Sequence, residues 1–149
     1  NKRFLFHHIA CASMPVLHDF NDRDLSNFIY AYAIADYVPK FEDGSTLHDH
    51  LAEKSIPLLG TFQPQGISNV LWAYATVGTS NSRLFEDAGE IISNYNLREF
   101  KPQELSNIVW AYATLKESDP KLFKIIADHI VSQHLDGFMP QTLSNISWA

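Results

Sequence analysis

Residues 62–76 read Phe-Gln-Pro-Gln-Gly-Ile-Ser-Asn-Val-Leu-Trp-Ala-Tyr-Ala-Thr, and residues 100–114 repeat this block as Phe-Lys-Pro-Gln-Glu-Leu-Ser-Asn-Ile-Val-Trp-Ala-Tyr-Ala-Thr. Residues 138–149 hold a third copy, Phe-Met-Pro-Gln-Thr-Leu-Ser-Asn-Ile-Ser-Trp-Ala, and residues 20–34 a diverged one, Phe-Asn-Asp-Arg-Asp-Leu-Ser-Asn-Phe-Ile-Tyr-Ala-Tyr-Ala-Ile. The first Phe stands at 20, 62, 100 and 138, in steps of 42, 38 and 38 residues. A period near 40 without strand-like alternation is typical of a helical-repeat solenoid.

Each block carries the signals that begin a helix. A proline at the first helical position costs no hydrogen bond, and Pro64, Pro102 and Pro140 fit that position. Phe62 then precedes the cap and Ile67 takes the fourth helical position, which is the spacing of a hydrophobic staple. We therefore predict a first helix over about 64–76 and over the equivalent residues of each unit.

A second helix follows the first in each unit. Its expected caps stand nineteen residues before each anchoring Phe, at Asn1, Asp43, Asn81 and Asp119. Apolar residues then keep the helical period, as at Leu122, Phe123, Ile126 and Ile130. We place the four extra residues of the 42-residue step in a surface loop around 37–42, where an insertion is tolerated.

The predicted fold is all-α: a right-handed α-solenoid of helix-turn-helix repeats with a period of 38 residues, as a fragment of a longer array. Residues 1–19 are the second helix of a preceding unit. Residues 20–61, 62–99 and 100–137 are full repeats, and 138–149 begin the next repeat.

Composition excludes several classes of protein. No stretch approaches the roughly 18–20 apolar residues of a membrane-spanning helix, so we expect a soluble protein without membrane insertion. The single Cys11 cannot form an internal disulfide. Seventeen acidic against eleven basic residues give a net charge of -6, which argues against a general polyanion binder. Residues 64–76 and 140–149 nevertheless carry no charge, and residues 102–114 carry only Glu104.

The 38-residue period and the Leu-Ser-Asn-x-x-Trp-Ala-Tyr-Ala motif resemble the octotricopeptide repeat proteins of algae and related protists, which are related to the heptatricopeptide and RAP-associated repeats. This resemblance implies a protein of chloroplast or mitochondrion. It further implies binding of single-stranded organellar mRNA or rRNA, with a role in RNA stability, processing or translation, or in ribosome structure. The first copy departs from the motif, because Asp22 and Arg23 replace Pro-Gln and Tyr30 replaces Trp.

A helical wheel separates two faces of the first helix. Ile67, Val70, Leu71 and Tyr74 share one face and are the predicted core. The opposite face carries what we call the amide stripe: Gln65, Asn69, Trp72 and Thr76, then Gln103, Asn107, Trp110 and Thr114, then Gln141, Asn145 and Trp148. Amides both donate and accept hydrogen bonds on a base edge, which suits RNA recognition.

Structural interpretations of the stripe are also open. Asn27, Asn69, Asn107 and Asn145 could join neighbouring repeats as a ladder, and the tryptophans could fill the groove between units. Base selection would need a position that varies, and the third helical position does: Asp24, Gly66, Glu104 and Thr142. Acids are also favoured at a helix start by the dipole. Phosphate contacts would fall to Arg23 and Lys101, with Lys116 further along.

The candidate RNA-binding residues are therefore Gln65, Gly66, Asn69, Gln103, Glu104, Asn107, Gln141, Thr142, Asn145, Lys101 and Arg23. No nucleophile elbow, Gly-rich phosphate loop or metalloprotease motif indicates an enzyme, and we expect no catalytic residue, metal or cofactor. The seven histidines are expected at the surface, and the pair of His7 and Cys11 lacks further metal ligands. The alternative function is a protein-binding scaffold subunit of a large organellar complex, such as a ribosome.

Overall fold

The computed structural model describes residues 1–134, 137, 138, 140 and 144, and every regular element within them is helical. The prediction of an all-α fold is confirmed for this part of the chain. The α-helices and the shorter 3-10 helices, labelled η, follow in the order α1 (Lys2–Ser13), η1 (Met14–Asp19), α2 (Asp22–Ile34), α3 (Leu47–Ser55), η2 (Ile56–Thr61), α4 (Pro64–Thr76), α5 (Ser82–Ser93), η3 (Leu97–Glu99), α6 (Pro102–Leu115) and α7 (Pro120–Ser132).

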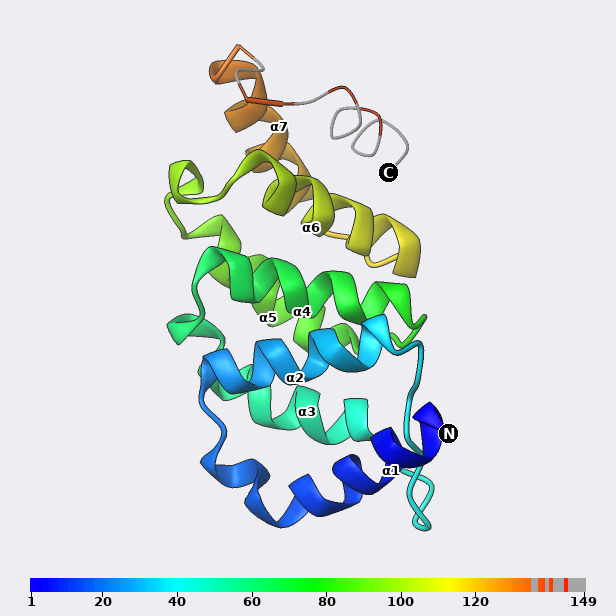
Figure 1. Cartoon of the computed structure of the whole chain (residues 1–149). Helices are drawn as coiled ribbons and strands as arrows, with labels where there is room; N and C mark the ends of the chain where they lie inside the picture. The colour runs from blue at the N-terminus through cyan, green and yellow to red at the C-terminus, as the bar shows by residue number, and fades with distance from the viewer. Residues whose placement is uncertain (135–136, 139, 141–143, 145–149) are drawn as a thin grey trace.

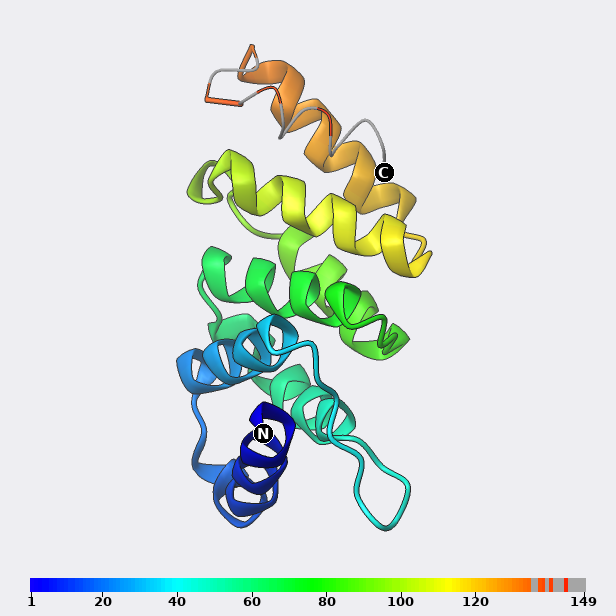
Figure 2. The same cartoon turned by 45° about the vertical axis from the view of Figure 1, so that its right-hand side comes forward.

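The helices form two rows (Figure 1). Helices α2, α4 and α6 lie side by side as one row, which we call the A row, and the most extensive packing in the molecule is α2 on α4 and α4 on α6. Helices α3, α5 and α7 form the B row behind it, where α5 packs on η2 and on α7 (Figure 2). Helix α1 lies at one end of the stack (Figure 1).

The A-row helices begin where the sequence predicts. Helices α4 and α6 start at Pro64 and Pro102, and the phenylalanine two residues earlier is buried together with the fourth helical residue in both. Helix α2 lacks the proline and starts instead with a capping box. There the Asn21 side chain accepts from the Asp24 N–H (2.9 Å) and the Asp24 carboxylate accepts from the Asn21 N–H (3.1 Å).

Three of the four predicted caps of the second helices are confirmed. The side chains of Asn1, Asn81 and Asp119 accept hydrogen bonds from the backbone N–H groups of Arg3, Leu84 and Leu122. The prediction for Asp43 is wrong, since α3 begins three residues later than expected and is capped by Thr46 and Asp49. The reason is the inserted loop, where Asp43 accepts from the Ser45 N–H (2.9 Å) and the backbone pairs at Lys40 and Thr46.

A column of tyrosines joins the A row to the preceding second helix. The hydroxyl groups of Tyr32, Tyr74 and Tyr112 donate to the backbone carbonyls of Phe6 (2.7 Å), His48 (2.5 Å) and Phe85 (2.5 Å). Each tyrosine ring also lies edge-on to the ring of the residue whose carbonyl it binds, with centroids 5.1, 5.2 and 4.9 Å apart. Because the same contact recurs between successive units, it sets how each A-row helix sits on its predecessor.

In α1 and α3 the second helix changes geometry before its end. The segment predicted as one helix up to Asp19 is α-helical to Ser13 and then 3-10 helical, and α3 passes into η2 in the same way. Pro15 and Pro57 lie at these changes. Because proline has no backbone N–H to donate, it interrupts the α-helical hydrogen bonds there. Among the described residues, no helix is both long enough and apolar enough to cross a membrane.

Candidate nucleic-acid interface

The amide stripe lies on the uncovered side of the A row. On α4, the predicted core residues Ile67, Val70, Leu71 and Tyr74 are all buried. On the opposite side Gln65 and Thr76 are exposed, and Asn69 and Trp72 are half-buried. On α6, Gln103 is exposed, and Asn107 and Trp110 are half-buried. The stripe residues predicted at Gln141, Asn145 and Trp148, and the variable Thr142, lie outside the described residues.

The asparagines do not form a ladder between the described repeats. The Asn107 side chain accepts a hydrogen bond from the Gln103 side chain of its own helix (2.9 Å). Among the described residues, the side chains of Asn27, Gln65 and Asn69 make no hydrogen bond. The interpretation of these asparagines as links between repeats is therefore wrong for the first three copies, and three amides remain able to donate and accept.

The aromatic column fills the seam between neighbouring A-row helices. The rings of Tyr30 on α2 and Trp72 on α4 lie 5.3 Å apart at an angle of 37°. Trp72 and Trp110 are partly buried against the core, whereas Tyr30 is an exposed residue. The predicted packing between units is confirmed for Trp72, Trp110 is partly buried against the core, and Trp148 lies outside the described residues.

Glu104 differs from the expectation of a free base-selecting residue. Its side chain is only 9% exposed, and its carboxylate accepts the backbone N–H of Lys101 (2.8 Å). Asp24 caps α2 in the same way. At the third helical position the acids are therefore committed to helix capping, as the dipole argument expects, and Glu104 is not available to select a base.

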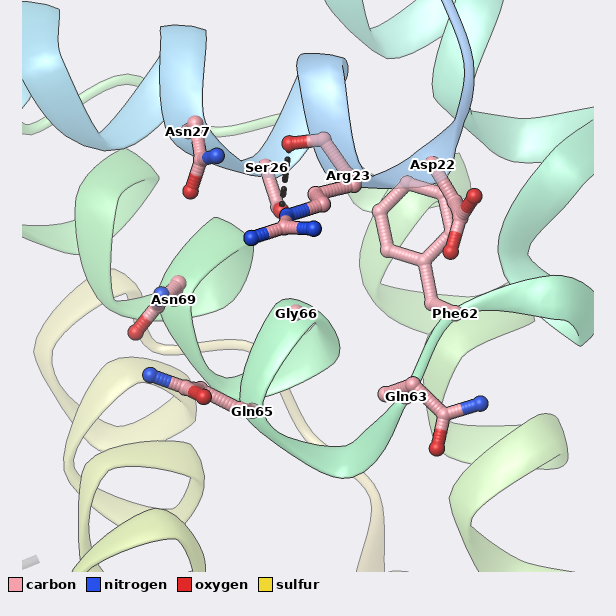
Figure 3. A pocket seen from close by; sticks show the side chains of 9 residues that line it. All are labelled: Asp22, Arg23, Ser26, Asn27, Phe62, Gln63, Gln65, Gly66 and Asn69. Atoms are coloured by element: carbon pink, nitrogen blue, oxygen red, sulfur yellow. Dashed lines mark hydrogen bonds between the residues drawn. The ribbon is translucent and has the colours of Figure 1, made fainter.

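Four of the predicted site residues meet in one cleft. Arg23 comes from α2, and Gln65, Gly66 and Asn69 come from α4 (Figure 3). The cleft lies between the first halves of α2 and α4 and encloses about 450 Å³. Its full lining is Asp22, Arg23, Ser26, Asn27, Phe62, Gln63, Gln65, Gly66 and Asn69. It combines one cation, one acid, several amides and an aromatic residue.

The other predicted site residues lie away from this cleft. Gln103, Glu104 and Asn107 are on α6, as is the exposed Lys101 at its start. Lys116 ends α6 with a positive φ of 58°, at the opposite end of the helix from Lys101. Of the three cations predicted to contact phosphate, Arg23 is the one that lines this cleft.

One histidine contradicts the expectation of surface histidines. His48 is fully buried between α3 and α4, and burial lowers its pKa to about 4. His48 packs against Tyr74 as Phe85 packs against Tyr112. In the sequence, only an alignment of these tyrosines with the preceding second helices would have indicated that His48 is buried. The His7 imidazole lies 3.7 Å from the Cys11 sulfur, and no group of three metal-ligating side chains occurs among the described residues.

Comparison with known protein families and with characterised proteins finds no match to this chain. Its function is therefore inferred from the arrangement of its own side chains.

Proposed function

We propose that this chain is an RNA-binding helical-repeat protein that uses the uncovered side of the A row. The observation that carries the proposal is the set of unpaired amides, Asn27, Gln65 and Asn69, beside the aromatic pair of Tyr30 and Trp72. Proteins that recognise single-stranded RNA hydrogen-bond the base edges and stack bases on aromatic rings. Both kinds of group lie next to each other on α2 and α4.

The distribution of charge supports this assignment. Helix α4 carries no charged residue, and the one acid of α6, Glu104, is buried in its cap. The A-row helices carry three of the seventeen acids, Asp22, Asp24 and Glu104, and the last two cap their helices. Little negative charge is therefore left on this row to repel a polyanion. Because few cations lie nearby, we expect moderate affinity.

The handedness and the period of the stack are also part of this proposal. We take the two rows as part of a right-handed solenoid with a period of 38 residues, of the octotricopeptide type that the sequence resembles. The tyrosine bonds support it, because they span 26, 26 and 27 residues in successive units. The partner would then be single-stranded organellar mRNA or rRNA in chloroplast or mitochondrion. The protein would act in RNA stability, processing, translation or ribosome structure.

An electrophoretic shift with single-stranded RNA at low and moderate salt tests the function. The wild-type protein should bind, and binding should weaken as salt rises. Replacing both Gln65 and Asn69 by alanine should lower affinity about fivefold or more, from the loss of two hydrogen bonds of ordinary strength. Asn94→Ala, which removes an exposed amide at the end of α5, is the matched control and should bind as wild type. Failure of the wild type to bind at low salt would reject the proposal.

A protein-binding scaffold is the second candidate. Phe4, Leu5, Ile9 and Val16 of α1 and η1 are exposed apolar residues at one end of the stack. Exposed apolar side chains that cluster on one surface are typical of protein interaction sites. Stoichiometric co-purification with a protein complex that Leu5→Asp abolishes, in a protein that binds no RNA, would favour this candidate.

A further inference from the structure

The cleft between α2 and α4 has a counterpart between α4 and α6 that differs at four positions of the lining. At the second helical position the α2–α4 cleft has Arg23 where the counterpart has Gln65. At the third position of the following helix it has Gly66 where the counterpart has Glu104. The other two differences are Asp22 against Pro64 and Gln63 against Lys101, so each site has one cation and one acid but holds them in different places.

Gly66 places no side chain in the cleft, whereas Glu104 at the equivalent position is a buried residue. In the α4–α6 seam Glu104 is buried, its carboxylate accepts from Lys101, and its carbonyl accepts from the Ser68 hydroxyl (3.3 Å). In the α2–α4 cleft the hydroxyl of Ser26, the counterpart of Ser68, donates to its own helix at the Arg23 carbonyl (3.1 Å).

A side chain at Gly66 would enter the cleft without a clash. A Cβ there would lie 3.5 Å from the Phe62 ring and 3.7 Å from Ser26, which is ordinary van der Waals contact. Glycine at this position therefore relieves no steric strain, and its effect is to keep the volume free.

Arg23 supplies an unpaired cation to this volume. Its guanidinium makes no hydrogen bond or ion pair among the described residues. In Figure 3 the guanidinium points into the cleft on the side of Asn27 and Asn69, and the Asp22 carboxylate points to the other side. Although Asp22 lines the same cleft, it does not neutralise the arginine by direct contact.

We propose that the α2–α4 cleft binds one nucleotide of single-stranded RNA, and that the α4–α6 seam, closed by Glu104, does not. The Arg23 guanidinium binds the phosphate as a fork, and Asn27, Gln65 and Asn69 hydrogen-bond the base edge. A volume of about 450 Å³ is sufficient for such a ligand. Recognition along the A row is then irregular instead of one base for every unit. This inference rests on the proposed RNA-binding function.

The sharpest test is Gly66→Glu, which copies the counterpart seam into the cleft. The new carboxylate can cap α4 at the Gln63 N–H as Glu104 caps α6, so the thermal unfolding midpoint should stay the same or rise. Affinity for short homopolymeric RNAs, measured by fluorescence anisotropy, should fall about tenfold, the effect of losing one charge-assisted contact. Arg23→Gln, which copies Gln65, should lower affinity by a similar factor. It should also reduce the slope of log affinity against log salt concentration by about one. Arg83→Gln on α5 is the matched charge control and should bind as wild type.

The outcomes separate the cleft from the function. If the wild type binds RNA and both Gly66→Glu and Arg23→Gln bind equally well, the cleft is overturned and the RNA-binding function stands. If Arg83→Gln weakens binding as much as Arg23→Gln, only overall charge matters and the cleft is again overturned. If the wild type binds no RNA at low salt, both proposals fail. Binding of an acidic peptide in place of RNA, lost in Arg23→Gln, would assign the cleft to a protein partner and overturn the nucleotide.

Discussion

His48 lies where two helices meet, and neither of its ring nitrogens has a hydrogen-bond partner in the part of the chain that the structure describes. Its ring packs edge-on against Tyr74, whose hydroxyl donates to the His48 carbonyl, and neighbouring units place Phe6 and Phe85 in the same contact. Asp49, the charged group that acts on it, raises the pKa by less than burial lowers it. The imidazole is therefore held neutral and acts as an aromatic ring of the core.

This burial makes stability depend on pH. The pKa of His48 is about 4 in the folded state against 6.5 in the unfolded state, so the unfolded chain binds the proton more tightly. Stability should be full above about pH 6.5 and should fall progressively as pH drops toward 4. Between pH 7 and pH 5 the loss from this residue should be about 2 kcal/mol. Urea unfolding of wild type and His48→Phe at both pH values measures it.

The contribution of His48 is the difference between the two proteins, because other groups titrate in both. His48→Phe should lose clearly less stability on acidification than wild type. Equal losses would show that the histidine is hydrated or paired in solution.

At the scale of elements, the inserted loop shows how a local change moves a helix start. Thr46 accepts from the Asp49 N–H (3.2 Å), and the Asp49 carboxylate accepts from the Thr46 N–H (2.7 Å). Gly44, with a φ of 85°, lets the chain turn before this capping box. Asp43 then serves the turn, so α3 is short and begins at Leu47.

Replacing Thr46, the observed cap of α3, should lower stability more than replacing Asp43, the cap predicted from the sequence. Thr46→Ala should lower stability by about 1 kcal/mol, the usual value for a lost N-cap. In a chain of this size that is a fall of about 2–4 °C in Tm. Asp43→Ala should give a much smaller shift in the same calorimetric measurement. A larger effect from Asp43→Ala would place the start of α3 where the sequence pattern puts it.

At the scale of the whole molecule, equivalent leucines of different units are exposed at the end of the stack and buried in its middle. A leucine precedes the aromatic residue of each second helix, at Leu5, Leu47, Leu84 and Leu122. The last three are 0, 0 and 1% exposed, whereas Leu5 is 57% exposed. Each unit is covered by its neighbours, and no described helix covers this face of α1.

Truncating the equivalent leucines should therefore have unequal costs. Leu47→Ala should lose about 2–5 kcal/mol, because it leaves a cavity in the core. Leu5→Ala should change stability by no more than about 0.5 kcal/mol, as exposed substitutions do. Chemical unfolding of the two variants side by side gives the comparison. Equal costs would mean that the face of α1 is covered in solution.

Much of the fold could be predicted because its signals are local. Pro64 and Pro102 favour the first position of a helix, and Ile67, Val70 and Leu71 share one face by the geometry of any α-helix. The recurrence of the block then determines that the units stack. Of the site, the side of the A row that carries Gln65 and Asn69 follows from the same periodicity.

What only the tertiary structure decided depends on the neighbour that each side chain meets. Glu104 and Gly66 hold equivalent positions, yet Glu104 is buried and caps its helix whereas Gly66 lines a cleft. The sequence around His48 does not distinguish it from the other histidines, yet it is buried against α4. Thr46 caps α3 in place of Asp43 because the backbone of the inserted loop pairs at Lys40 and Thr46. The sequence by itself determined the starts of most helices and their core faces, since these follow from backbone geometry within a few residues, but it did not determine the start of α3. Burial, pairing and open volume were decided by contacts between units, which no single segment contains.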